Sequence, residues 1–262
     1  MIKKVGLLLM AVLLVVLTGC SGSGSSSSGS SAKQKTIVMG TSADYPPFES
    51  VDTVHANKII GFDIDMAKYI THKLGYKLII KNQDFNGLIA ALNSNKVDFV
   101  MAGMVDTPAR EKQVDFSNVY YHEYQVILTK KSSGINSVKD LKGKTVGVQL
   151  GSTQQALAKK LNKTIPMHIQ TWDKLNEMVE AMNAGKVDAV ITVGSVAYGY
   201  TNKLKTLHQF RALVNGKPQS DPISAAFPKG SKLPAKFNKV LTQMQKNGKT
   251  DQLVTKWIKN QK

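Results

Sequence analysis

The sequence predicts an α/β protein built from two similar lobes. The segment 91–100 (ALNSNKVDFV) recurs as 181–190 (AMNAGKVDAV), with six of the ten positions identical. Each copy predicts a helix end, a polar turn and a short buried strand, and each follows an earlier candidate strand, at 36–41 or 144–150. Strands that alternate with helices form parallel sheets, so we expect two α/β units. A solenoid is disfavoured because a third copy is missing.

Periodic apolar residues predict several helices. One apolar face follows Gly61, where large residues recur every fourth position. These residues are Phe62, Met66, Ile70 and Leu74. Asn86 is the expected N-cap of a next helix that runs through Leu88 and Leu92. Two amphipathic helices are expected near the C-terminus, at 233–245 and 250–259.

The N-terminus has the pattern of a processing signal. Two lysines precede an apolar run at 5–17, which has the length of a signal-peptide core and is short for a membrane span. The following LTGC, which ends at Cys20, resembles the lipobox of bacterial lipoproteins, whose cysteine carries the lipid. We therefore expect a signal peptide at 1–19 and, at 20–35, the lipidated cysteine with a flexible Ser/Gly tether.

The charge balance is strongly basic, with 35 Lys+Arg against 18 Asp+Glu and a net charge of +17. Only two of these cations are arginines, Arg110 and Arg211, whereas nucleic-acid readers rely on arginine. The composition therefore favours a generally basic surface and no nucleic-acid partner. One cysteine cannot form an intramolecular disulfide, and the five scattered histidines fit no metal motif. We expect no catalytic residue, metal or cofactor.

Four segments carry recognisable motifs. They are 40–49 (GTSADYPPFE), 61–65 (GFDID), 107–117 (TPAREKQVDFS) and 146–154 (VGVQLGSTQ). In this order they resemble the signatures of the polar amino-acid solute-binding proteins of ABC importers, family 3 of the bacterial extracellular solute-binding proteins. The resemblance covers almost all of residues 36–262.

The resemblance implies a type II periplasmic-binding-protein-like fold, with two hinge crossings and a ligand cleft between the lobes. Lobe 1 would comprise 36–128 plus 222–262, and lobe 2 would comprise 129–221. The implied partners are a small-molecule ligand and the permease and ATPase subunits of the importer. We expect a monomer that is lipid-anchored at the extracellular face of the membrane of a Gram-positive bacterium.

Arg110 is the strongest candidate for binding a ligand carboxylate, because its planar fork of donors matches a carboxylate bidentately. The family places its carboxylate-binding arginine at this point of the motif. A surface arginine paired with Asp115 or Glu111 is the alternative. The segment Gly151, Ser152 and Thr153 lies between a strand and a predicted helix, where free backbone amides favour an anion. A plain turn is the alternative for that segment.

The resemblance places further residues around the ligand. Tyr45 and Phe85 match the family's aromatic walls, although aromatic residues beside strand ends also serve as core. Ala102 and Gly103 would offer backbone groups at the end of a strand. Val105 stands where many relatives have Ser or Thr, so it keeps an amide and lacks the hydroxyl.

Two departures concern the ligand's α-ammonium group. Val193 aligns with the aspartate that normally binds this group, and Ser42 stands where several relatives have Asp. A buried ammonium without a carboxylate is costly. Either Asp44, Asp106 or Thr192 takes the role, or the ligand is a carboxylate that lacks the standard α-amino group. The predicted ligand-binding residues are Ser42, Asp44, Tyr45, Phe85, Ala102, Gly103, Val105, Arg110, Gly151, Ser152, Thr153 and Val193.

Three classes of function follow. The first is a lipid-anchored receptor that captures an amino acid or related small carboxylate for an importer. The second is a surface adhesin or wall-binding lipoprotein, which the basic charge favours. The third is a dehydratase-like enzyme, since some relatives of the fold are dehydratases of cyclic acids.

Overall fold

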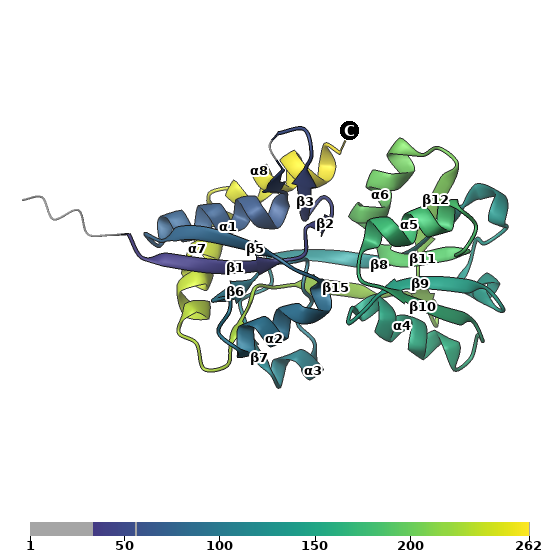
Figure 1. The fold of residues 1–262 in the computed structure, drawn as a ribbon, viewed down its shortest axis with the longest axis horizontal. Helices are drawn as coiled ribbons and strands as arrows, with labels where there is room; N and C mark the ends of the chain where they lie inside the picture. Colours follow the sequence, from purple (N-terminus) through teal and green to yellow (C-terminus); the bar gives the residue numbers. More distant parts are fainter. Residues whose placement is uncertain (1–33, 56, 262) are drawn as a thin grey trace, which may run out of the picture. The chain divides into compact units, whose positions relative to one another are not determined.

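The computed structural model describes residues 34–55 and 57–261 (Figure 1). The predicted signal peptide at 1–19, the lipidation site Cys20 and most of the tether lie outside these residues. Within the described ranges, no helix is both long and apolar enough to cross a bilayer.

The first lobe is built on a five-stranded sheet with the order β5-β1-β6-β16-β7. Strand β1 runs parallel to β5 and β6, whereas β16 is antiparallel to β6 and β7. The bounds are β1 Thr36–Thr41, β5 Lys77–Asn82, β6 Phe99–Val100, β7 Val114–Phe116 and β16 Ala226–Pro228. A small antiparallel sheet precedes the first helix, with β2 Asp44–Tyr45, β3 Glu49–Asp52 and β4 Lys58–Ile60.

Helices lie on both faces of this sheet (Figure 1). They are α1 Phe62–Lys73, the 3₁₀ turn η1 Phe85–Gly87, α2 Leu88–Asn93, α3 Pro108–Glu111, α7 Leu233–Lys246, α8 Lys249–Val254 and the π-helical η4 Thr255–Lys259. Phe237 of α7 packs edge-on against Phe99 and Phe227 of the sheet, at centroid distances of 5.0 and 4.9 Å. Large apolar burial of this kind dominates the stability of such a core.

The second lobe repeats the plan with a sheet ordered β10-β9-β11-β8-β12. Its strands are β8 Tyr121–Lys130, β9 Thr145–Gln149, β10 His168–Trp172, β11 Ala189–Val193 and β12 Leu207–Arg211. Its helices are η2 Lys131–Ser133, η3 Val138–Leu141, α4 Thr153–Asn162, α5 Leu175–Asn183 and α6 Gly194–Lys203. A short hairpin, β13 Leu213–Val214 and β14 Lys217–Pro218, follows.

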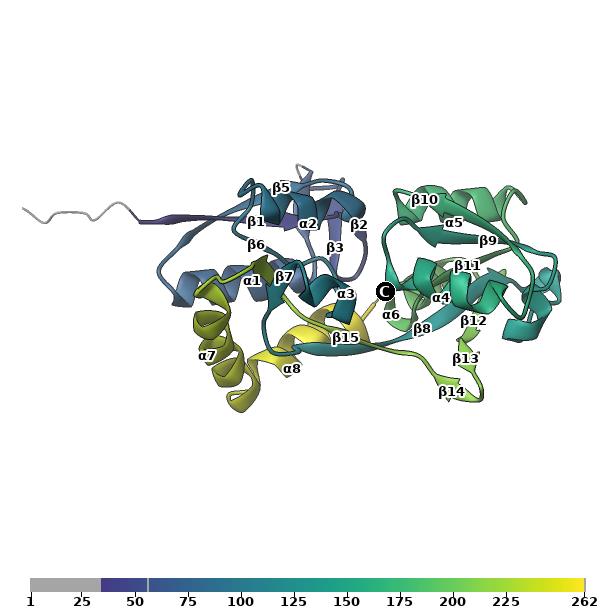
Figure 2. The same ribbon diagram turned by 90° about the horizontal axis from the view of Figure 1, so that it is seen from below.

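Two extended strands connect the lobes, which gives the two-lobed α/β architecture of periplasmic-binding-protein-like folds. The long strand β8 enters the second lobe, and β15 (Ser220–Ile223) returns beside it (Figure 2). They pair antiparallel, from Ser220 opposite Tyr124 to Ile223 opposite Tyr121. Because each strand holds the other in register, the side chains of both are fixed relative to the cleft.

The internal repeat is confirmed, and the structure explains its aspartates. In both copies a helix, α2 or α5, leads through a turn into a buried strand. Asp98 Oδ2 accepts a hydrogen bond from the amide of Val38 in β1, at 2.7 Å. Asp188 Oδ2 accepts one from the amide of Thr145 in β9, also at 2.7 Å. Each aspartate therefore ties the start of its strand, β6 or β11, to the neighbouring strand of its own lobe, β1 or β9.

Most predicted elements form where the patterns place them. The strands expected at 36–41 and 144–150 are β1 and β9, and the helix expected after Gly61 is α1. The expected C-terminal helix 250–259 divides into α8 and η4. The prediction that Asn86 caps a helix is wrong, because Asn86 lies inside η1 and α2 begins at Leu88 after Gly87.

Candidate functional site

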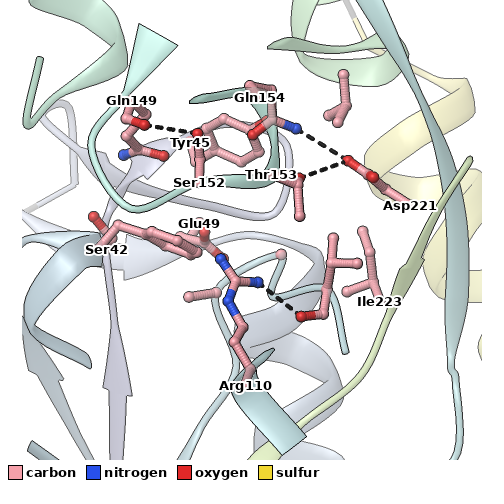
Figure 3. A pocket seen from close by; sticks show the side chains of 15 residues that line it. Ser42, Tyr45, Glu49, Arg110, Gln149, Ser152, Thr153, Gln154, Asp221 and Ile223 are labelled. Carbon is pink, nitrogen blue, oxygen red and sulfur yellow. Dashed lines mark hydrogen bonds between the residues drawn. The ribbon is translucent and has the colours of Figure 1, made fainter. Parts of the chain in front are cut away.

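A cavity lies between the two lobes, where the loops after β1, β6 and β9 meet β15 (Figure 3). Ten predicted ligand-binding residues line it. They are Ser42, Tyr45, Phe85, Ala102, Gly103, Val105, Arg110, Ser152, Thr153 and Val193. Five further lining residues were not predicted, namely Glu49, Gln149, Gln154, Asp221 and Ile223. Asp44 and Gly151 are not among the lining residues.

Arg110 supplies the cationic side chain of the cavity. Thr107 caps the short helix α3, whose first turn presents Arg110, and the side chain is only 8% exposed. Its Nη1 donates to the carbonyl of Val105 at 2.7 Å, and its Nη2 donates to the carbonyl of Gly151 at 2.9 Å. A guanidinium has five N–H donors, so three remain for a ligand. Burial lowers the pKa of Arg110 to about 10, which leaves it charged at neutral pH.

The neighbours of Arg110 distinguish a ligand-binding arginine from a surface arginine in an ion pair. The Phe85 ring lies 5.3 Å from the guanidinium carbon, so it flanks the cation. Asp115 pairs instead with Lys229, at 2.8 Å. Since Arg110 is buried and its side-chain hydrogen bonds go to two backbone carbonyls, the alternative of a surface arginine paired with Asp115 or Glu111 is wrong.

The start of α4 faces Arg110 from the second lobe. Ser152 is the N-cap, and its Oγ accepts from the Gln155 amide at 3.1 Å while it donates to the Gln149 carbonyl at 2.6 Å. The amides of Thr153 and Gln154, at the first two helical positions, have no intrahelical acceptor. Free amides and the positive helix end favour an anion here. Gly151 contributes its carbonyl oxygen to Arg110 from a left-handed backbone conformation, with φ 76°.

Asp221 brings a carboxylate into the cavity from the connecting strand β15. It is 3% exposed, and its carboxylate accepts three side-chain hydrogen bonds. One comes from Gln125 Nε2 at 2.9 Å. The other two come from Thr153 Oγ1 at 3.1 Å and Gln154 Nε2 at 3.0 Å (Figure 3). Burial raises the pKa of Asp221, although these donors and the charge of Arg110 act in the opposite direction. A carboxylate has about four acceptor positions, so one remains open.

Glu49 is a second acidic group in the cavity lining. It is fully buried, and neither carboxylate oxygen has a hydrogen-bond partner within the described part of the chain. Burial, reinforced by the charges of Asp63 and Asp44, raises the pKa of Glu49 well above its ordinary value. A buried carboxyl group without partners is costly unless something else binds it. Its side chain is therefore available to a ligand.

Aromatic and backbone groups complete the lining. Tyr45 Oη lies 3.2 Å from Thr192 Oγ1 of the other lobe, and the Tyr45 ring stacks on Phe48 at 6.1 Å. Gly103 adopts φ 55°, and its amide donates to Asp63 Oδ2 at 2.8 Å. The amide predicted to face a ligand is thus taken by Asp63.

None of the three residues considered as substitutes for the missing ammonium partner lines the cavity. Asp44 accepts hydrogen bonds from Ser42 Oγ and from the amide of Leu175. Asp106 accepts from Ser224 Oγ at 3.3 Å, and Thr192 contacts Tyr45. Val193 does line the cavity, as an apolar residue. The carboxylates that reach the cavity are those of Glu49 and Asp221.

Sequence signals for the two missed acids were weak. Glu49 closes the PPFE motif. It directly follows the buried Phe48 and begins strand β3, so its position along the chain indicates a structural role. Asp221 precedes Pro222 in a segment with no motif, and its position depends on the pairing of β15 with β8. No group of three or more His, Cys, Asp or Glu side chains in 34–55 and 57–261 is arranged to hold a metal ion.

Comparisons with known proteins identify the family of this chain. The family profile of the bacterial extracellular solute-binding proteins, family 3, matches residues 37–260. The chain is 42% identical over 256 residues to the arginine-binding extracellular protein ArtP of Bacillus subtilis (strain 168), with 98% of each chain covered.

Solved structures extend the similarity. The arginine-, lysine-, histidine-binding protein ArtJ of Geobacillus stearothermophilus is 35% identical with a TM-score of 0.79, covering 86% of this chain and 96% of that chain. The ancestral amino acid-binding protein AncCDT-1, a precursor of cyclohexadienyl dehydratase, is 35% identical with a TM-score of 0.77 and the same coverage. The profile match, the two-lobed fold and the cavity between the lobes lead to one conclusion. The chain belongs to family 3 of the bacterial extracellular solute-binding proteins.

Proposed function

We propose that this chain is the receptor of an ABC importer for L-arginine or another amino acid with a cationic side chain. One observation carries the proposal: the cavity lining contains one guanidinium, Arg110, and two carboxyl groups, Glu49 and Asp221. A cationic amino acid carries the complementary set, which is one carboxylate and two cationic groups. The relatives named for arginine, lysine and histidine support the same class of ligand.

In this proposal the ligand carboxylate lies between Arg110 and the first turn of α4. The free N–H groups of Arg110 come from the first lobe, and the amides of Thr153 and Gln154 come from the second. One ligand group thus bridges both lobes, so ligand binding favours closure. Arg110 itself already reaches across the cleft, because it donates a hydrogen bond to the carbonyl of Gly151 in the second lobe.

The two carboxyl groups would bind the two cationic groups of the ligand. Asp221 has one open acceptor position and Glu49 has all of its own, so both can accept charged hydrogen bonds. Asp221 would thereby take the role of the aspartate that relatives have at the position of Val193. This arrangement favours an amino acid over a carboxylate without an amino group.

The cellular setting is proposed on the sequence motifs. Cys20 would carry the lipid that anchors the chain at the extracellular face of the membrane, with 20–35 as the tether. The closing units would be 36–128 plus 222–262 and 129–221, with a monomer delivering its ligand to the permease and ATPase subunits. Binding, with no chemical change in the ligand, is the proposed activity.

Titration calorimetry with three probes tests the ligand class. L-arginine carries all three charges, L-citrulline is a nearly isosteric neutral side-chain analogue, and 5-guanidino-2-oxopentanoate lacks the amino group. Each analogue is expected to bind at least about tenfold more weakly than L-arginine, because each loses a charged hydrogen bond. Equal affinity for the oxo acid would show that no ammonium group is recognised. No binding of L-arginine, L-lysine or L-histidine would reject the proposal.

Matched variants link the result to the two acids. Asp221→Asn and Glu49→Gln keep the size of each side chain and remove its charge, so each should weaken L-arginine binding by about tenfold or more. Asp115→Asn removes a carboxylate that pairs with Lys229 outside the cavity lining, and its affinity should match the wild type. If all three variants bound equally, the two acids would have no role in recognition.

A further inference from the structure

Asp44 of the first lobe forms a hydrogen bond with the backbone of the second lobe. Its Oδ2 accepts from the amide of Leu175 at 2.7 Å, across 131 positions of the chain. Leu175 is the first residue of α5, and Asp44 begins the short strand β2. Asp44 is not among the residues that line the cavity, so this contact involves no group that would touch a ligand there.

The amide of Leu175 has no partner inside its own helix. The first amides of any helix lack intrahelical acceptors and need a cap. The N-cap residue of α5 is Lys174, which makes no side-chain capping bond. A carboxylate at this end also interacts favourably with the helix dipole. Asp44 therefore caps α5 from the opposite lobe.

The Asp44 carboxylate is already oriented for this contact. Ser42 Oγ donates to Asp44 Oδ1 at 2.7 Å, which leaves Oδ2 for Leu175. The Asp44 amide donates to the Ser42 carbonyl at 2.8 Å, and β2 pairs with β3 through Asp44 and Ser50. Because the first lobe alone fixes this geometry, little side-chain entropy is lost when the lobes meet.

Two neighbouring contacts cross between the same lobes. Tyr45 Oη lies 3.2 Å from Thr192 Oγ1, and Asn86 Nδ2 approaches Asp173 Oδ1 at 3.5 Å. The first pair joins two neutral hydroxyl groups and the second is long for a hydrogen bond, whereas the Asp44 carboxylate accepts from a backbone amide at 2.7 Å. Charge-assisted bonds of that kind are the stronger ones.

We propose that Asp44 is a positioning residue that stabilises the closed arrangement of the lobes by capping α5 across the cleft. This inference rests on the proposed function only in that closure captures a ligand. Opening of the cleft breaks the Asp44–Leu175 bond and leaves the helix end uncapped. Since Asp44 does not contact the cavity, its loss should weaken every ligand by the same factor.

The first test compares affinities for two ligands. Asp44→Ala should weaken L-arginine and L-lysine equally, by about three- to thirtyfold, which is the range expected for a lost helix cap. Asp44→Asn keeps one acceptor oxygen, so its affinity for each ligand should lie between those of Asp44→Ala and the wild type. Asp84→Ala removes an exposed carboxylate from the groove that Asp44 also lines, and it should leave both affinities unchanged. An unchanged affinity in Asp44→Ala, or a changed ratio between the ligands, contradicts the proposal.

The second test needs no ligand and separates this inference from the proposed function. Amide hydrogen exchange reports whether the Leu175 N–H is bonded. Leu175 should exchange at least about tenfold faster in Asp44→Ala than in the wild type, while the amides of β9 stay unchanged. If the wild type binds neither amino acid, the ligand proposal fails and the exchange result alone decides. Equal exchange of Leu175 in both proteins would overturn the capping contact.

Discussion

The guanidinium of Arg110 donates a hydrogen bond to the carbonyl oxygen of Gly151 in the opposite lobe, with 2.9 Å between Nη2 and the oxygen. The same side chain is bonded to the Val105 carbonyl of its own lobe at 2.7 Å. Arg110 therefore joins the two lobes and lines the cavity between them. In the proposed function, one residue thus serves both carboxylate recognition and closure.

Replacing Arg110 with lysine should nearly abolish ligand binding although the positive charge remains. Lysine cannot keep the fork that contacts both carbonyls and still offers donors to a carboxylate. We expect L-arginine to bind at least about 100-fold more weakly, which corresponds to the loss of one or two charged hydrogen bonds. Titration calorimetry measures this change.

Arg211 supplies the matched control, because it is the other arginine of the chain. Its guanidinium carbon lies 4.2 Å from the centre of the Tyr124 ring, and Arg211 is not among the residues that line the cavity. Arg211→Lys should retain the wild-type affinity. A loss in Arg211→Lys equal to that in Arg110→Lys would point to general destabilisation instead of a site effect.

Ligand binding should release protons. Burial raises the pKa of both Glu49 and Asp221, so each binds a proton more readily in the empty cavity than an ordinary carboxyl group does. A bound cation favours the ionised form and lowers these pKa values. The affinity for L-arginine should therefore fall as the pH falls from neutral toward the raised pKa values. Calorimetry in buffers of different ionisation enthalpy measures the protons released.

Glu49→Gln isolates one of the two groups. This variant should release fewer protons and show a flatter dependence of affinity on pH than the wild type. Proton uptake on binding, or no proton exchange in the wild type, would contradict the assignment of these acids to the ligand's cationic groups.

Asp63 should make the ligand-free protein less stable as the pH rises. Burial raises the pKa of Asp63 to about 7, although the amide of Gly103 acts in the opposite direction. Because the folded state then binds more protons than the unfolded chain, the free energy of unfolding decreases between about pH 4 and pH 7. Asp63→Asn removes this dependence and keeps an oxygen for Gly103.

Urea unfolding at the two ends of this pH range measures the effect. The contribution of Asp63 is at most about 4 kcal/mol, since one pKa unit corresponds to about 1.4 kcal/mol. The pH dependence should be weaker in Asp63→Asn by up to this amount. An identical pH dependence in the variant would show that Asp63 is ionised throughout the range.

The two lobes were predictable from the sequence because the repeat encodes a local structural requirement. Asp98 and Asp188 each accept an amide hydrogen bond from the neighbouring strand of their own lobe, β1 or β9, so the same residues recur at the same turn. The helix that follows Gly61 was predictable for a similar reason, since one apolar face packs on one sheet. Patterns that arise within one lobe are visible along the chain.

Asp98→Ala and Asp188→Ala should have equal and independent effects on stability. Each loses one hydrogen bond to a strand amide, which costs about 1 kcal/mol of unfolding free energy. The two sites lie in different lobes, so the double variant should lose the sum. Denaturant unfolding of the four proteins measures this. A strongly non-additive double variant would argue against two independently built lobes.

The residues that the sequence did not predict owe their positions to contacts between distant segments. Asp221 reaches the cavity because β15 pairs with β8, and no local pattern specifies that pairing. Asp44 was expected at the ligand, yet the approach of α5 directs its carboxylate to Leu175. Asn86 was expected to cap α2, but it lies in a 3₁₀ turn and faces Asp173 of the second lobe. Sequence patterns could not show how the lobes meet.

The most direct test of the central claim is a crystal structure of the protein bound to L-arginine. We expect the ligand carboxylate to contact Arg110 and the amides of Thr153 and Gln154. The two cationic groups of the ligand should contact Asp221 and Glu49. The hydrogen-bond distances from the ligand to these five residues are the measurement. A ligand whose carboxylate lies away from Arg110, or whose cationic groups contact neither acid, would show that these residues do not recognise a cationic amino acid.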